Sequence, residues 1–221
     1  RDIDLSSFKT PNLIKIDNMF YGCSILQSIN FGDDFDTKKV TSMNSVFEGC
    51  KYLTDINLSK FNTQNVESMV KLFNGCSSLR TLSLASFDTS KVTDMSDMFT
   101  YCSSLTSLDV TSFLTSKVKS MSNMFQECSS LTSLNVNRFD TSQVTEMSNM
   151  FANCQQLKQL DIASFNTQNV VSVSAMFNQC ISLTSLRIGT LNFAKASYFQ
   201  FMFHNCTSLT SLEMANFQTR S

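Results

Sequence analysis

Apolar residues recur along the chain in a pattern that repeats every 26 residues. Cysteine marks the register, because a first interval of 27 residues between cysteines is followed by six intervals of 26. The cysteines are Cys23, Cys50, Cys76, Cys102, Cys128, Cys154, Cys180 and Cys206. In all eight units a Phe precedes the Cys by three residues and a Leu follows it by three. The sequence is therefore a tandem repeat, and we number each unit by its Cys.

Two periodicities share each unit, as the fourth unit illustrates. From Val92 to Leu105 apolar residues recur every three or four positions, which predicts a short helix or a 3₁₀-like turn. Leu108 and Val110 then alternate with polar residues, which is the period of a short strand with one buried face. Turns of the type Phe87–Thr89 join the units. The pattern predicts an α/β solenoid of about eight 26-residue helix-strand units, with a parallel sheet on the concave face.

Two motifs carry a family resemblance. The run L-x-x-L-x-V-x-x-F from Leu105 to Phe113 resembles the strand segment of leucine-rich repeats. The motifs M-F-x-x-C-x-x-L and F-D-T-S-x-V-T-x-M are similar to the 26-residue bacterial surface-protein repeat, which is related to BspA-like leucine-rich repeats and is common in mycoplasma lipoproteins. The resemblance implies a cell-surface or secreted adhesion module whose partner is a host extracellular-matrix or cell-surface protein. We expect residues 1–221 to form a single solenoid domain from a longer chain that carries a signal sequence and an anchor.

Composition and charge narrow the function classes. The chain has seventeen Lys and Arg residues and eighteen Asp and Glu residues, so it lacks the basic excess needed for nucleic-acid binding. We therefore expect no nucleic-acid partner. One His and five Gly provide few residues for a general base or a phosphate-binding loop. We therefore expect that the protein is not an enzyme and binds no cofactor. No apolar run approaches the length of a membrane span, so we expect none in this chain.

The sulfur-containing residues follow the repeat register. Met residues occupy positions expected to be buried, which indicates core packing rather than a metal site. Regular spacing argues against a zinc site, whose cysteines cluster at short intervals. Each Cys shares a face with the Phe three residues before it and the Leu three residues after it, so we expect a column of buried thiols. A ladder of disulfides between units is the alternative.

The polar positions of the predicted strands form the first candidate binding surface. Stacking turns the residues seven after each Cys into a column across the sheet. The column runs Asn30, Asn57, Ser83, Asp109, Asn135, Asp161, Arg187 and Glu213. We select Asp109, Asn135, Asp161, Arg187 and Glu213 as candidate contacts for an extended protein or a glycan. An ordinary solvated surface is the alternative interpretation.

The eighth unit departs from the pattern. Tyr198 and Phe201 occupy positions that are polar in most other units, and their spacing would place both on one exposed face of a helical turn. These two aromatics are the second candidate site, either for a partner or for end-to-end self-association. Packing against a following cap or domain is the other explanation.

The function that these patterns favour is a non-enzymatic binding module for adhesion or protein-protein interaction. The alternative is a structural spacer or self-assembling surface layer with no ligand of its own.

Overall fold

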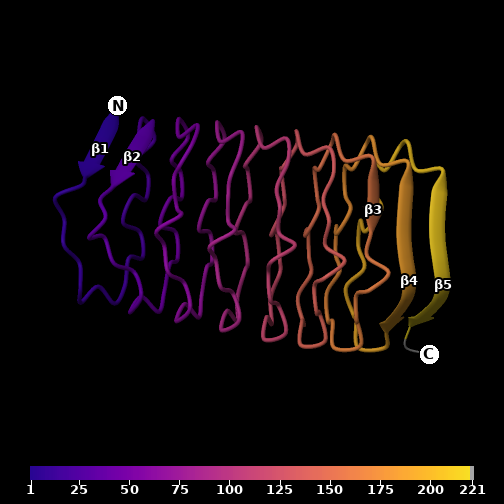
Figure 1. Ribbon diagram of the computed structural model, residues 1–221. Helices are drawn as coiled ribbons and strands as arrows, with labels where there is room; N and C mark the ends of the chain where they lie inside the picture. Colours follow the sequence, from indigo (N-terminus) through magenta and orange to yellow (C-terminus); the bar gives the residue numbers. More distant parts are fainter. Residues whose placement is uncertain (220–221) are drawn as a thin grey trace.

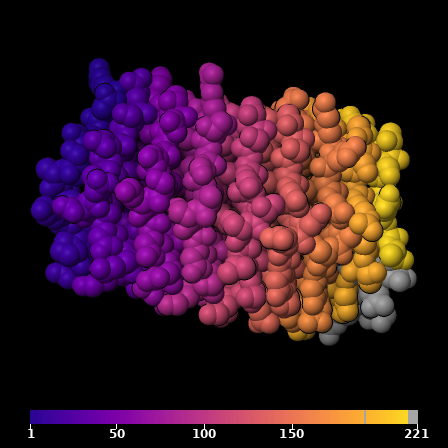
Figure 2. Space-filling view, in the orientation of Figure 1, coloured from indigo at the N-terminus to yellow at the C-terminus, as the bar shows by residue number. Residues whose placement is uncertain are grey.

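The computed structural model of the protein describes residues 1–219, which wind into a coil of stacked units (Figure 1). Successive units follow one another along one axis, so the two ends of the chain lie at opposite ends of the body (Figure 1). The space-filling view shows the units as successive bands along this elongated shape (Figure 2). Parallel bridges join equivalent backbone positions of neighbouring units from Lys15 and Ser42 as far as Ser172 and Tyr198. The 26-residue period is thus one turn of the coil.

Five strands are present in the described residues. β1 (Asp2–Leu5) pairs in parallel with β2 (Ser28–Phe31) at the N-terminal end. At the C-terminal end β3 (Gln159–Asp161), β4 (Ser185–Phe193) and β5 (Ser211–Thr219) form a second parallel sheet. We call the surface formed by residues five to eight after each Cys the strand face. The continuous concave sheet expected from the sequence is replaced by two separate sheets at the ends.

The α/β prediction is wrong, because residues 1–219 contain no α-helix. The segment before each Cys is a run of tight turns instead. In the fourth unit, the Cys102 amide donates to the Phe99 carbonyl over 3.1 Å, and the Leu105 amide donates to the Cys102 carbonyl over 3.1 Å. Bonds from residue i to i−3 match the strict three-residue spacing of Val92, Met95 and Met98, whereas an α-helix repeats every 3.6 residues.

Left-handed backbone at two positions in each unit interrupts any helix. Five residues before each Cys, φ lies between 54° and 60°, and one residue before it φ lies between 57° and 76°. The first set is Asn18, Ser45, Lys71, Asp97, Asn123, Asn149, Ala175 and Phe201. An L-residue in this conformation cannot continue a right-handed helix, so each such residue ends one turn and begins the next.

The same left-handed residues direct backbone amides toward the next unit. In the fourth unit the amides of Asp97, Phe99 and Tyr101 donate to carbonyls of the fifth unit over 2.9 to 3.0 Å. Equivalent bonds join the second unit to the third and each later pair in turn. We call this surface, formed by residues eight to one before each Cys, the turn face. Because the ladder on the strand face is interrupted between β2 and β3, the turn face carries the continuous backbone hydrogen bonding between units.

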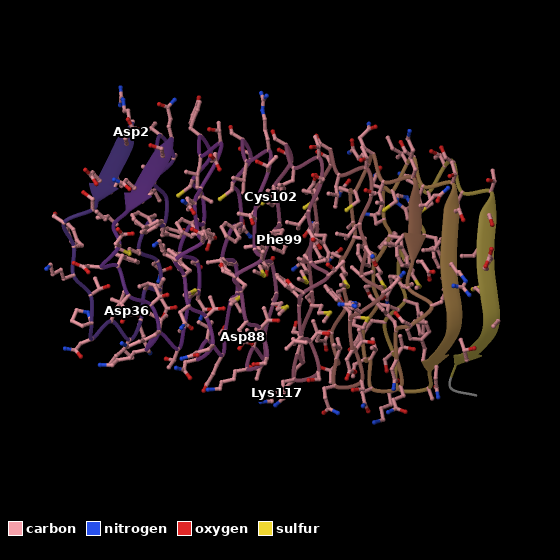
Figure 3. The ribbon with its side chains drawn as sticks, viewed as in Figure 1. Asp2, Asp36, Asp88, Phe99, Cys102 and Lys117 are labelled. Carbon is pink, nitrogen blue, oxygen red and sulfur yellow. The ribbon has the colours of Figure 1, made fainter. Side chains whose placement is uncertain are left out.

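The interior is filled by columns of identical side chains. The Phe three residues before each Cys stacks on its counterpart in the next unit, with ring centroids 5.4 to 5.9 Å apart and planes within 9° of parallel. Phe99 and Cys102 lie in the middle of the coil, whereas Asp88 and Lys117 lie along one edge (Figure 3). Burial of these apolar columns supplies the main driving force for stacking.

In addition to the Phe column, a column of threonines connects the turns of neighbouring units by hydrogen bonds. Thr89 is 1% exposed, and its hydroxyl donates to the Leu114 carbonyl over 3.0 Å while accepting from the Leu114 amide over 2.8 Å. Asp88 accepts a hydrogen bond from the Ser90 amide over 2.9 Å and closes the local turn. The Phe-Asp-Thr motif therefore serves both the turn itself and the contact with the next unit.

All eight cysteines are free thiols, which excludes the disulfide ladder. Six of them are buried, and Cys23 and Cys206 in the end units are half-buried. The Cys128 Sγ donates to the Phe99 carbonyl of the preceding unit over 3.2 Å, and the same bond recurs from Cys50 to Cys206. Burial raises the pKa of Cys128 from an ordinary value of 9.0 to about 12. The predicted thiol column is confirmed for the six inner cysteines.

The thiol column makes stability depend on pH in the alkaline range. Unfolded thiols release their protons near pH 9.0, whereas the folded Cys128 thiol keeps its proton until about pH 12. The stabilisation is therefore complete below pH 9.0 and is lost as the pH rises toward 12. Cys128→Ser keeps a donor for the Phe99 carbonyl but does not titrate in this range. We expect the free energy of unfolding, measured with urea at several pH values, to fall less steeply in the variant than in the wild type. Equal slopes would contradict this account, because Cys128 is the only difference between the two proteins.

Candidate functional site

The strand face brings together four of the five candidate residues of the predicted strand column. In the units from Cys23 to Cys180, residues six and eight after the Cys are buried or half-buried, whereas residues five and seven are half-buried or exposed. Strand register places Asp161 beside Arg187 and Arg187 beside Glu213. Asn135 belongs to the preceding unit and lines the same surface hollow. Stacking of units thus makes neighbours of residues that are 26 positions apart.

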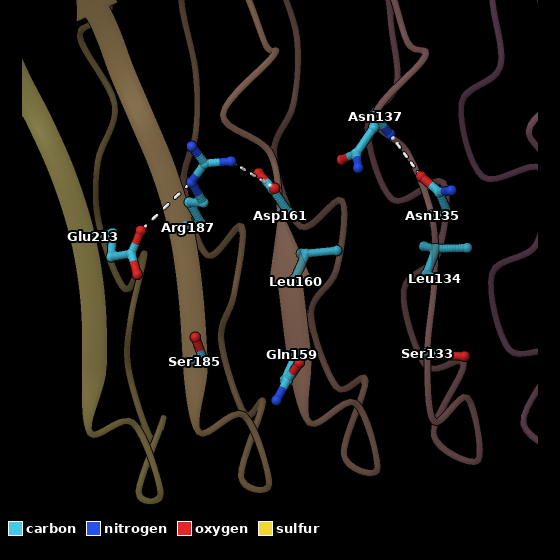
Figure 4. A pocket seen from close by; sticks show the side chains of 10 residues that line it. All are labelled: Ser133, Leu134, Asn135, Asn137, Gln159, Leu160, Asp161, Ser185, Arg187 and Glu213. Carbon is cyan, nitrogen blue, oxygen red and sulfur yellow. Dashed lines mark hydrogen bonds and ion pairs between the residues drawn. The ribbon is translucent and has the colours of Figure 1, made fainter.

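Arg187 forms ion pairs with carboxylates on both sides. Its Nη1 lies 3.1 Å from Asp161 Oδ2, and its Nε lies 3.5 Å from Glu213 Oε2 (Figure 4). We call Asp161, Arg187 and Glu213 the Arg187 triad. The three side chains are 37% to 65% exposed, so solvent screens these pairs and they add little to stability. Their effect is to hold the guanidinium in one orientation and to leave the triad with one net negative charge.

The triad forms one side of a shallow hollow with a volume of about 450 Å³. Leu134 and Leu160 are buried beneath it, with exposed fractions of 9% and 3%. Hydroxyl and amide side chains complete the lining, among them Ser133, Gln159 and Ser185 (Figure 4). The hollow offers hydrogen-bond donors and acceptors over four neighbouring units. Such a surface can orient an extended polar ligand.

Asp109 does not line the hollow, and it has a local structural role. Its Oδ1 accepts hydrogen bonds from the Thr111 amide over 2.9 Å and the Thr111 hydroxyl over 2.6 Å. These bonds lower the pKa of Asp109, with the hydroxyl as the larger cause. Asn135 and Asp161 also accept from the amide two residues later, over 3.1 and 2.9 Å. Part of the Asp and Asn signal in this column is therefore turn stabilisation rather than ligand binding.

Tyr198 and Phe201 are exposed, with exposed fractions of 53% and 66%, but they do not lie on a helix. They lie on the turn face, and Phe201 has a left-handed φ of 60°. The equivalent positions of the second to seventh units are half-buried or buried, whereas those of the first unit, Lys15 and Asn18, are exposed. The exposure of the two aromatics thus follows from their place in the last described turn-face segment.

A second hollow, of about 540 Å³, was not found from the sequence. It lies near the N-terminal end and is bordered by Tyr21 and Tyr101. The available signal was a column of glycines, Gly22, Gly49 and Gly75, placed directly before the first three cysteines and absent from this position in later units.

The described residues provide no metal centre. No group of three or more His, Cys, Asp or Glu residues within 1–219 is placed to hold a metal ion. The lone His204 contacts Asn178 Oδ1 through Nδ1 over 2.9 Å on the exposed surface. In the same part of the chain, no helix has the length and apolar character needed to cross a membrane.

Comparison with known proteins identifies related folds. A family model described as "Mycoplasma protein of unknown function, DUF285" matches residues 2–54, 14–135 and 130–221. A leucine-rich repeat protein from T. pallidum is 16% identical, with a TM-score of 0.50 over 94% of this chain and 77% of its own. A leucine-rich repeat protein from Bacteroides ovatus is also 16% identical, with a TM-score of 0.46 over 99% of this chain and 71% of its own.

A leucine-rich cell surface protein from Faecalibacterium prausnitzii is 17% identical, with a TM-score of 0.30 over 97% of this chain and 83% of its own. No curated protein matches the chain. The resemblance to bacterial leucine-rich surface-protein repeats that was read from the sequence is confirmed. At these levels of identity the solved structures establish the fold alone.

Proposed function

The chain belongs to the DUF285 family, and from that membership and the strand face we propose that it is a non-enzymatic module that binds a protein partner at the cell surface. The repeat fold supports protein interaction in general, because a solenoid presents long rows of outward side chains on a rigid body. The resemblance to bacterial surface-protein repeats supports adhesion to a host extracellular-matrix or cell-surface protein. The partner would lie along the strand face.

The hollow around the Arg187 triad is the observation that carries this proposal. Arg is among the residues that contribute most to protein interfaces, and a guanidinium already oriented by two carboxylates loses less freedom on binding. The carboxylates of Asp161 and Glu213 remain partly exposed and can accept further hydrogen bonds. We expect a polar, extended protein segment with donor groups opposite these carboxylates.

A triple variant tests this site with a matched control. Asn135, Asp161 and Arg187 are replaced together by Ala, and Asp109→Ala is the control, since Asp109 caps its own turn as Asp161 does but lies outside the hollow. We expect the triple variant to bind an immobilised panel of fibronectin, fibrinogen and collagen at least about tenfold more weakly in interferometry, because contacts at the centre of an interface dominate its affinity. The control should bind as the wild type does. Equal binding by the triple variant would remove the strand face as the site.

A second candidate function is a self-assembling spacer. The exposed apolar side chains of the two end units favour it. Tyr198 and Phe201 are exposed at one end, and Phe8 and Ile14 are exposed at the other with fractions of 51% and 58%. In the described residues β1 and β5 each pair along one side only, so a second copy could extend either sheet.

Light scattering over a range of protein concentrations tests self-assembly. If copies stack end to end, the mass should rise with concentration, and Tyr198→Ser with Phe201→Ser should keep the protein monomeric. A wild-type protein that stays monomeric at all concentrations would contradict the spacer function.

A further inference from the structure

The second hollow is built on three glycines that lie in contact along the axis of the coil. Gly22, Gly49 and Gly75 each stand directly before the Cys of their unit. A Cβ atom on Gly49 would lie 3.5 Å from the Gly22 Cα, and one on Gly75 would lie 3.5 Å from the Gly49 Cα. Three adjacent backbones without side chains therefore form the floor of the hollow.

The turn alone does not require these glycines. Their φ values of 71° to 76° are left-handed, yet the same position holds Tyr101, Glu127, Asn153 and Gln179 at φ values of 60° to 62°. Side chains are thus accommodated at this position in other units. Space for a Cβ also exists at Gly22, where no other atom comes within 4 Å. The three glycines leave the backbone uncovered at this position, whereas the later units carry a side chain there.

Two exposed tyrosines border this floor. Tyr101 occupies the glycine position of the fourth unit and ends the glycine column, while Tyr21 precedes Gly22 in the first unit. Their exposed fractions are 51% and 59%, so both rings are largely uncovered. Successive units are 5.4 to 5.9 Å apart at their stacked Phe rings, so the floor extends over two such steps and Tyr101 lies one step beyond it. Exposed aromatic rings beside a hollow are typical of binding sites.

The floor offers no free backbone amide to an extended peptide. The amides of Gly22, Gly49 and Gly75 each donate to a carbonyl of the next unit over 2.7 Å. The carbonyls of Gly22 and Gly49 accept from Ser24 and Lys51 over 2.6 and 2.8 Å. Ring faces and side chains are therefore the main groups that can recognise a ligand here. Sugar rings suit this chemistry, because their C–H faces stack on aromatic rings and their hydroxyls bond to polar side chains.

The charges around the hollow favour an anion. Glu48 is 19% exposed and lies 4.0 Å from the Lys71 Nζ, so its charge is compensated. Lys51 also lines the hollow, and no carboxylate among the described residues lies within 4.0 Å of its ammonium group. Ser24, Ser77 and Asn74 add uncharged hydrogen-bonding groups. One uncompensated cation beside two tyrosines is complementary to a sugar ring that carries a carboxylate.

We propose that the glycine-floored hollow between Tyr21 and Tyr101 binds an acidic glycan. The tyrosine rings stack on sugar faces, Lys51 pairs with the sugar carboxylate, and the glycines let the rings approach the backbone. This site lies on a different surface from the Arg187 triad and is independent of the strand-face proposal. Sialylated oligosaccharides and uronic-acid polysaccharides share the required carboxylate.

Calorimetric titration with three probes tests the proposal. Sialyllactose and hyaluronan oligosaccharides represent the two sources of the carboxylate, and lactose is the neutral control. We expect saturable binding of at least one acidic probe and much weaker binding of lactose. Lys51→Gln should abolish this preference for the acidic probe, because it removes the cation and keeps a hydrogen-bonding side chain.

Three variants test the position of the site. Gly49→Asn fills the floor with a residue that the fold already accepts there as Asn153, and Tyr101→Asn removes one ring with the same replacement. Both should bind at least about tenfold more weakly, with unchanged unfolding midpoints. Tyr198→Ser removes an exposed tyrosine at the other end and should bind normally. Absence of saturable binding to either acidic probe, or wild-type affinity in both Gly49→Asn and Tyr101→Asn, would overturn the proposal. A peptide that binds at this hollow when no sugar does would also overturn it.

Discussion

Backbone hydrogen bonds on the turn face set the spacing and register of neighbouring units, while burial of the apolar columns drives their stacking. The amides of Met95, Asp97, Phe99 and Tyr101 all donate to the following unit over 2.9 to 3.1 Å. At a net contribution of about 1 kcal/mol each, such bonds are individually modest. Their regular recurrence fixes the distance between units and keeps each Phe and Cys column in register. The left-handed residues make this possible, because they turn backbone amides out of the local turns and toward the next unit.

This arrangement separates the residues that maintain the fold from those that are free to vary. The interior columns and the Thr hydroxyls occupy fixed register positions, and almost every unit keeps them. The outward positions of the strand face, and the position directly before each Cys, differ between units. Departures from the repeat therefore mark the candidate sites: Arg187 interrupts a mostly acidic and amide column, and three glycines open a hollow near the N-terminal end.

The sequence alone predicts the 26-residue unit, the buried columns and the stacking, because these follow from which residue types recur. It also predicts that Asp161, Arg187 and Glu213 are neighbours, since equivalent positions of stacked units must adjoin. The predicted helix is wrong because the apolar residues before each Cys are spaced three positions apart, whereas an α-helix repeats every 3.6 residues. Nothing in Lys71 or Ala175 signals the left-handed backbone that they adopt. The glycine-floored hollow does not follow from the sequence pattern, because absent side chains rather than reactive residues form it.

Amide hydrogen exchange measured by NMR shows whether the turn face carries the hydrogen bonds that connect the units and leaves the strand face available for a partner. We expect slow exchange for the amides of Asp97, Phe99 and Tyr101, which donate to the next unit. We expect faster exchange for the amides of residues 107 and 109, whose side chains point outward on the strand face between β2 and β3. Strong protection at residues 107 and 109 with rapid exchange at Asp97 and Tyr101 would contradict it. That result would mean that a sheet on the strand face, rather than the turns, connects the units.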